Sequence, residues 1–146
     1  MIYLYQDQLN QVPATCSRNG FLMDPDYLWS VTHKLTGKVW NFIPYRVIPT
    51  TDYKPGYDLF CINVSQTLPE VFTGSTNCSN TSTLNLYPGE YFIKVYEQYS
   101  DSNLVPGDAD DIVYETIMWV IGVNQNEPIT YSGTSDIFIL YNEDND

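Results

Sequence analysis

One stretch of the chain, residues 88–99, constrains the fold more than any other. It opens with Pro88 and Gly89, a turn signal, and the ten residues after them are mostly strong strand formers. Because successive side chains of a strand point to opposite faces, one face is predicted to pack inward and the other to meet water. The inward face is predicted to carry Tyr91, Ile93, Val95 and Glu97, and the outward face Phe92, Lys94, Tyr96 and Gln98.

A second strand is predicted over residues 113–121, which read VYETIMWVI and end at Gly122. The connection between the two strands, residues 100–111, is polar and contains Pro106 and Gly107. Two strands joined in this way are typical of an antiparallel pair. We take this pair as the centre of a β-sandwich.

Other short segments extend the pattern. Strands are predicted at residues 2–5 (an edge strand), 27–32, 38–43, 57–64, 84–87 and 136–141, with the second and third forming a hairpin. The total of about seven or eight strands predicts an all-β, immunoglobulin-like antiparallel β-sandwich. Residues 1–123 are expected to form the sandwich domain, and residues 124–146 a linker, a last strand and an acidic tail.

The length, composition and charge of the chain argue against several classes of protein. A chain of 146 residues with 43% hydrophobic content is expected to be one folded domain. A formal net charge of -12 argues against binding to nucleic acid, because lysine and arginine must neutralise the phosphates. No apolar run approaches the roughly 20 residues that a membrane helix needs, and no signal peptide is recognisable, so we expect no membrane partner.

Side chains that carry catalysis or bind cofactors are sparse. His33 is the single histidine and is predicted to lie on the surface near a hairpin turn. The carboxylates of Glu97 and Glu115 could approach each other across the central pair of strands, as the two catalytic carboxylates of a glycosidase do. We favour the interpretation that both side chains are solvated and have no catalytic role. The loop with Asp101, Asp108, Asp110 and Asp111 lacks the spacing of a calcium loop. We therefore predict no catalytic residue, no metal site and no cofactor.

The three cysteines, Cys16, Cys61 and Cys78, are an odd number and do not predict a disulfide framework. Cys61 lies in an apolar run and is predicted to be a small buried side chain. These features favour synthesis in a reducing cytoplasm.

The last predicted strand contains five adjacent apolar residues, 137–141, whose full burial would contribute on the order of 7–15 kcal/mol before other costs. It either completes its own sheet or adds to the edge of a neighbour's sheet. The two terminal segments are the predicted partner-contact elements. Their residues are Ile2, Tyr3, Leu4, Tyr5, Ile137, Phe138, Ile139, Leu140 and Tyr141.

Several segments resemble the small β-sandwich virion proteins of tailed bacteriophages, in particular the crAss-like phages of Bacteroidales and their relatives. The run GEYFIKVYEQ at residues 89–98 carries most of the resemblance, together with YET at residues 114–116. The supporting segments, all within residues 1–123, are 1–4, 24–43, 57–60, 87–88, 102–106 and 113. The relatives usually continue with Gly-Lys where Ile117 and Met118 stand here.

The resemblance implies a non-enzymatic structural protein of the virion, made in the host bacterial cytoplasm. We expect an auxiliary (decoration) protein on the capsid exterior, present in many copies, with the major capsid protein as its partner. A tail or head–tail connector component is the alternative within that class. A carbohydrate-binding module is the alternative from another class, because the same fold hosts many functions.

Overall fold

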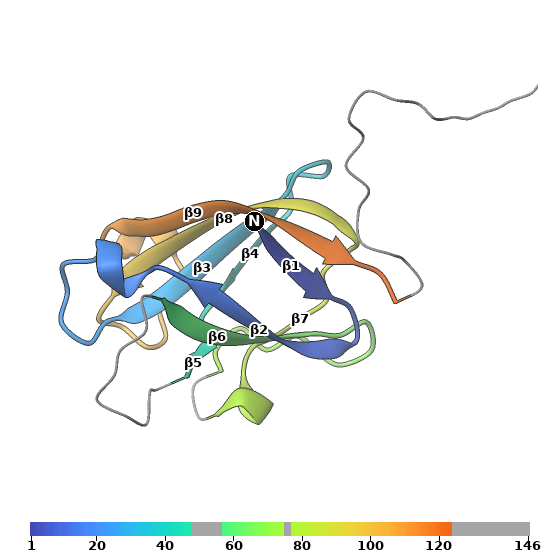
Figure 1. Ribbon diagram of the computed structural model, residues 1–146, viewed down its shortest axis with the longest axis horizontal. Coiled ribbons are helices and arrows are strands. Elements are labelled where there is room, and N and C mark those ends of the chain that lie inside the picture. Colours follow the sequence, from blue (N-terminus) through green and yellow to red (C-terminus); the bar gives the residue numbers. More distant parts are fainter. Residues whose placement is uncertain (48–56, 75–76, 124–146) are drawn as a thin grey trace, which may run out of the picture.

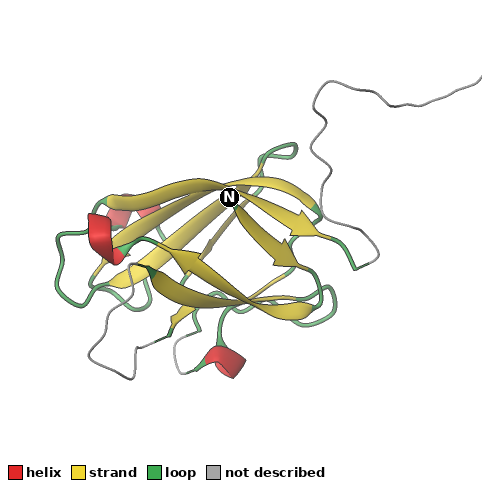
Figure 2. Ribbon diagram, in the orientation of Figure 1, coloured by secondary structure: helices red, strands yellow, loops and turns green. Residues whose placement is uncertain are grey.

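The computed structural model describes residues 1–47, 57–74 and 77–123, and these form two β-sheets packed face to face (Figure 1). Within these residues the elements are nine strands and three short 3₁₀ turns, and Figure 2 shows that the turns lie outside the sheets. The prediction of an all-β sandwich is confirmed. Its immunoglobulin-like character stays a prediction.

The larger sheet has five strands in the order β1-β9-β8-β3-β4. Their bounds are Ile2–Tyr5 for β1, Ile112–Ile121 for β9, Gly89–Gln98 for β8, Asp26–His33 for β3 and Val39–Phe42 for β4. The smaller sheet has the order β2-β6-β5, with β7 also paired to β6. Its strands are Gln8–Ala14 for β2, Asp58–Val64 for β6, Tyr45–Arg46 for β5 and Thr83–Leu84 for β7. The 3₁₀ turns are η1 (Ser17–Asn19), η2 (Cys78–Asn80) and η3 (Pro106–Asp108).

The central pair has the predicted antiparallel arrangement, with Tyr91 opposite Met118 and Ile93 opposite Thr116. All four residues predicted to face inward on β8 are buried. Gln98, predicted to meet water, is buried as well, because its side-chain amide donates hydrogen bonds to the carbonyl oxygens of Ser100 and Asn103. The loop that follows β8 therefore folds back over the end of the strand.

The core lies between the two sheets and is rich in aromatic rings. Trp29 of β3 packs edge-on against Phe60 of β6, with ring centroids 5.0 Å apart, and also contacts Phe42 of β4. The contact with Phe60 crosses from one sheet to the other, and the contact with Phe42 lies within the larger sheet. They hold the sandwich together through dispersion and burial of apolar area.

The prediction that the strands of the sandwich are all antiparallel is wrong. β1 pairs with β9 in parallel, and β6 pairs with β7 in parallel. The parallel pairing of β1 follows from topology, because the chain begins at one edge of the larger sheet and then crosses to β2 in the other sheet. Residues 8–14, which the sequence analysis did not assign to a strand, form the edge strand β2.

The described residues of the polar segment 73–83 form an ordered structure. They contain η2, the start of β7 and a side-chain bond from Thr81 Oγ1 to the carbonyl oxygen of Cys61. Gly74 donates a backbone hydrogen bond to Ile43. The polar sequence of this segment does not predict its ordered structure, because the local hydrogen bonds of serine, threonine and asparagine side chains leave no pattern in the sequence.

Candidate functional site

A pocket of about 150 Å³ opens where β3, β4, β5 and β6 come together. Its wall is formed by two prolines, two tyrosines, an aspartate, an arginine and two apolar side chains. These are Pro25, Asp26, Tyr27, Ile43, Pro44, Tyr45, Arg46 and Phe60. Burial raises the pKa of Asp26, and the negative charge of Asp101 adds to that effect.

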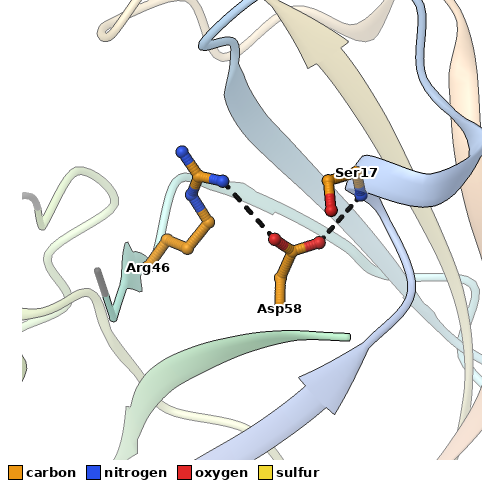
Figure 3. Close-up of polar contacts among 3 residues, drawn as sticks. All are labelled: Ser17, Arg46 and Asp58. Carbon is orange, nitrogen blue, oxygen red and sulfur yellow. Dashed lines mark hydrogen bonds and ion pairs between the residues drawn. The ribbon is translucent and has the colours of Figure 1, made fainter. Parts of the chain in front are cut away.

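Arg46 is the cation of this pocket, and its charge is already engaged. Its Nη1 atom lies 3.4 Å from Oδ1 of Asp58 (Figure 3). The guanidinium also stands over the ring of Tyr27. The second carboxylate oxygen of Asp58 accepts a hydrogen bond of 2.8 Å from the backbone N–H of Ser17. Asp58 therefore ties β5, β6 and η1 together, which is a structural role.

Cys16 lies next to this ion pair and is completely buried. Burial raises the pKa of its thiol well above the usual range, and the charge of Asp58 raises it further. The thiolate is the nucleophilic form of cysteine, so a thiol held in its protonated form is a poor nucleophile. The residues around the pocket thus form a packed polar contact and not a nucleophilic centre.

Tyr27 gives the protein a predicted sensitivity to alkaline pH. Burial, with a contribution from Asp58, raises its pKa to about 12, compared with about 10 in an unfolded chain. Between these values the unfolded state loses a proton that the folded state keeps, so stability is full below pH 10 and falls as pH rises toward 12. Urea midpoints at pH 9, 10 and 11 should fall more steeply for the wild type than for Tyr27→Phe. Equal slopes would contradict this prediction.

The prediction that His33 lies on the surface is wrong. The side chain is buried, and its ring packs edge-on against Tyr87 and Tyr91. Its Nδ1 atom accepts a hydrogen bond from the backbone N–H of Thr36. β3 continues through His33, so the alternation that buries Val31 also turns His33 inward. The hydroxyl oxygen of Thr36 also lies 3.0 Å from Nδ1, so the histidine is held within the hairpin turn by both groups of Thr36.

Glu97 and Glu115 do not approach each other. Glu97 is buried on the inner face, where its carboxylate accepts hydrogen bonds from the backbone N–H groups of Phe21 and Leu22. Glu115 is exposed and lies opposite Lys94 on the outer face. A pair of cooperating carboxylates is thereby excluded, and Glu97 anchors the loop between η1 and β3.

The aspartates of residues 101–111 do not gather into a metal site. Across residues 1–47, 57–74 and 77–123, no three histidine, cysteine or acidic side chains converge in a way that could hold a metal ion. The loop is tied down by its backbone instead, since Glu97 N–H donates to Asp111 and Asp110 N–H donates to Glu97.

The structure pairs Cys61 of β6 with Cys78 of η2 as a disulfide, which corrects the expectation that the cysteines form no bridge. The two Cα atoms are 5.4 Å apart, and the chain between them spans 17 positions. The odd number of cysteines argued against a disulfide framework, but the third cysteine, Cys16, is a buried free thiol and the other two are paired. The bridge fastens the polar segment before β7 to the smaller sheet.

Reduction of this bridge should destabilise the protein by about 3 kcal/mol, the amount expected for a closed loop of this length. Urea unfolding with and without a reductant measures the difference. The variant Cys78→Ala should start at the lower stability and should not respond to the reductant. A wild type whose unfolding midpoint ignores the reductant would contradict the prediction.

The outer face of the five-stranded sheet carries a patch of large side chains, which we call the outer patch. It consists of Tyr3 on β1, Ile117 and Trp119 on β9, Phe92 on β8 and Val39 on β4. The strand register places Tyr3 beside Trp119, and Phe92 beside Ile117. Phe92 is 47% exposed and Val39 is 48% exposed, so the patch is partly open to solvent.

The predicted contact residues of the N-terminal segment divide between the two faces of β1. Ile2 and Leu4 are buried in the protein's own core, whereas Tyr3 is exposed and Tyr5 is partly exposed. Any partner contact at β1 is therefore restricted to the outward side chains and to the strand edge. The C-terminal contact residues, 137–141, lie outside the described residues.

The sequence analysis missed Phe92, Ile117, Trp119 and Val39 as contact candidates. Phe92 had been assigned to the outward face, and extending the alternation across β9 would have placed Ile117 and Trp119 beside it. In the described ranges the structure has no helix long and apolar enough to cross a bilayer. Comparisons with protein-family models, curated proteins and solved structures find no match.

Proposed function

We propose that this protein is a non-enzymatic structural component of a tailed-phage particle, and that it binds the capsid exterior as an auxiliary (decoration) protein. The observation that carries the proposal is the outer patch. Aromatic and aliphatic side chains of β1, β9, β8 and β4 lie on one face of the same sheet and are partly exposed, with Thr32 of β3 between Phe92 and Val39. Such patches mark protein-binding surfaces more often than isolated exposed residues do.

Two further features support this assignment. The resemblance of residues 89–98 to phage virion proteins falls on β8, the strand that contributes Phe92 to the outer patch. The net charge of -12 suits an outer position on the particle better than contact with packaged DNA. Many copies bound to a repeating lattice would give strong attachment even if each contact were weak.

The test is co-sedimentation of the purified protein with assembled capsids of the phage that encodes it. Phe92→Asp should weaken binding by about 30-fold or more, because a charge would be buried at the centre of the contact. Phe21→Asp is the matched control, since Phe21 is 85% exposed in the loop between η1 and β3 and is not part of the outer patch. If neither variant changes binding, the patch is not the contact surface.

Labelled copies of the protein distinguish a position on the capsid from a position in the tail or at the head–tail junction. Electron microscopy of labelled virions should place the protein on the capsid exterior. A label confined to the tail or to the head–tail junction would refute the decoration role and support the connector alternative.

A carbohydrate-binding module is the second candidate, and one observation favours it. Tyr3, Trp119 and Phe92 present rings on one sheet face, and aromatic rings stack on sugars as well as on protein surfaces. Binding to a glycan array that is lost in Trp119→Ala, without capsid association, would support this candidate over the first.

A further inference from the structure

The smaller sheet ends in a strand with one open edge. β2, Gln8–Ala14, is the last strand of that sheet and pairs with β6 on one side (Figure 1). Within residues 1–47, 57–74 and 77–123, no strand pairs with its other side. An edge strand of this kind presents backbone N–H and C=O groups that another strand can bind.

The hydrogen bonds of β6 show which residues of β2 line the open edge. The backbone N–H of Asn63 donates to the carbonyl oxygen of Ser82, so the backbone groups of Asn63 point away from β2. Leu9 lies opposite Asn63, and its backbone groups therefore point away from β6. The direction alternates along a strand, so the backbone groups of Gln11 point to the same edge. Within the described part of the chain, no hydrogen bond reaches the backbone groups of these two residues.

Two residues limit the open edge to five positions. Asp7 has a φ of 57°, which is outside the extended conformation of a strand. Pro13 has no N–H group and cannot donate to a strand beside it. The usable edge is therefore residues 8–12, with the sequence QLNQV, and it contains no charged side chain. Charged side chains are a common means of keeping an edge strand unpaired, and this edge lacks them.

We propose that the edge of residues 8–12 binds the same edge of a second copy of this chain, with the two β2 strands antiparallel about a two-fold axis at Asn10. In this register Leu9 of each copy lies opposite Gln11 of the other. Each of these two pairs exchanges both of its backbone hydrogen bonds, so the smaller sheets of the two copies become one continuous sheet. The inference does not depend on the virion role.

The register and the choice of a second copy follow from the two limits of the edge. An axis at Gln11 would place Leu9 opposite Pro13, which has no N–H to donate. An axis at Leu9 would place Gln11 opposite Asp7, where the backbone is not extended. Pairing about Asn10 satisfies every donor and acceptor that Leu9 and Gln11 present. The edge is thus self-complementary, as a two-fold interface requires.

Charge is compatible with a second copy despite the net charge of -12. Asp7 directly precedes the edge, and in this register it lies opposite Pro13 of the other copy. The two Asp7 residues are then about 20 Å apart, at roughly 3.4 Å per residue. This separation exceeds the Debye length of about 8 Å at physiological ionic strength, so their repulsion is screened. Each Leu9 side chain, which is 42% exposed, would pack on Gln11 of the other copy.

Hydrogen exchange of the full chain at two concentrations tests the pairing directly. The amides of Leu9 and Gln11 should exchange at least about tenfold more slowly at about 1 mM than at about 10 μM, because only pairing between copies protects them. The amides of Asn10 and Val12 face β6 and should be protected equally at both concentrations. A dimer in which Leu9 and Gln11 stay unprotected would place the contact elsewhere and overturn the proposal.

Sedimentation of the full chain over the same concentration range measures the association. The wild type should convert from monomer to dimer. Gln11→Pro should weaken the dimer at least about tenfold, because each copy loses a donor at the interface while its pairing with β6 is kept. Gln11→Ala is the matched control, since it keeps the N–H group and should retain the dimer. Circular dichroism checks that both variants fold.

Two outcomes of the sedimentation experiment would overturn the proposal. A wild type that stays monomeric up to about 1 mM would leave the edge to a strand of a different protein. An equal loss of the dimer in Gln11→Ala and Gln11→Pro would assign the contact to the glutamine side chain and not to backbone pairing.

Discussion

Replacing Trp29 with alanine is expected to lower the free energy of unfolding by about 3–5 kcal/mol. The side chain is fully buried and touches aromatic rings from both sheets, Phe42 in the larger and Phe60 in the smaller. Its removal leaves a cavity between two rigid layers that cannot close over it. Urea denaturation followed by circular dichroism measures the loss.

Trp29→Phe is the matched variant, and it should cost less than about 2 kcal/mol. Phenylalanine keeps a ring between the sheets and removes the indole N–H, which is buried without a hydrogen-bond partner in the described structure. Leu35→Ala, at an exposed turn position, should change stability by less than about 0.5 kcal/mol. If Trp29→Ala is no worse than Leu35→Ala, the two sheets are not held together as described.

The strands that could be predicted from sequence are those specified by local pattern. Residues 89–98 and 112–121 each form a ten-residue strand rich in strand-forming residues, and their antiparallel pairing needs only one connecting loop. The hairpin of β3 and β4 was predicted for the same reason, since its strands are neighbours in the chain. Alternation also predicted which side chains of β8 face the core, except for Gln98.

Features set by distant contacts could not be predicted. The partner of Cys61 depends on how residues 73–83 fold back onto β6, and the parallel pairing of β1 depends on a strand more than a hundred residues away. Glu97 and Glu115 required the full register of the sheet before their opposite faces could be assigned. The position of His33 depended on one more residue of strand than the pattern predicted, because a strand that continues through His33 places it on the same inward face as Val31.

The same reasoning explains why β1 was predicted as a contact element and is mainly a core element. A short apolar segment at the start of a chain has the same sequence pattern whether it packs on its own sheet or on a partner. Only the pairing with Met118 and Val120 shows that Ile2 and Leu4 are buried within the molecule.

Gly107→Ala provides the reference for the last prediction, because a Cβ atom at this position in η3 meets no neighbouring atom. Alanine there should be neutral or should stabilise the protein by up to about 1 kcal/mol, since it restricts the unfolded chain. The same change at a glycine packed against backbone should have the opposite effect, and Gly74 is such a position.

Gly74→Ala is expected to destabilise the protein by about 4 kcal/mol, near the upper end for a single substitution. Gly74 is buried, and a Cβ atom there would overlap the backbone of Thr81 and Ser82, which cannot rotate away as a side chain could. The strain would separate this segment from residues 81–83, and it would weaken the backbone hydrogen bonds that Val71 and Thr83 exchange. Thermal and urea unfolding of both glycine variants measure the contrast. Similar stabilities for the two variants would show that the segment after Val71 does not pack against residues 81–83.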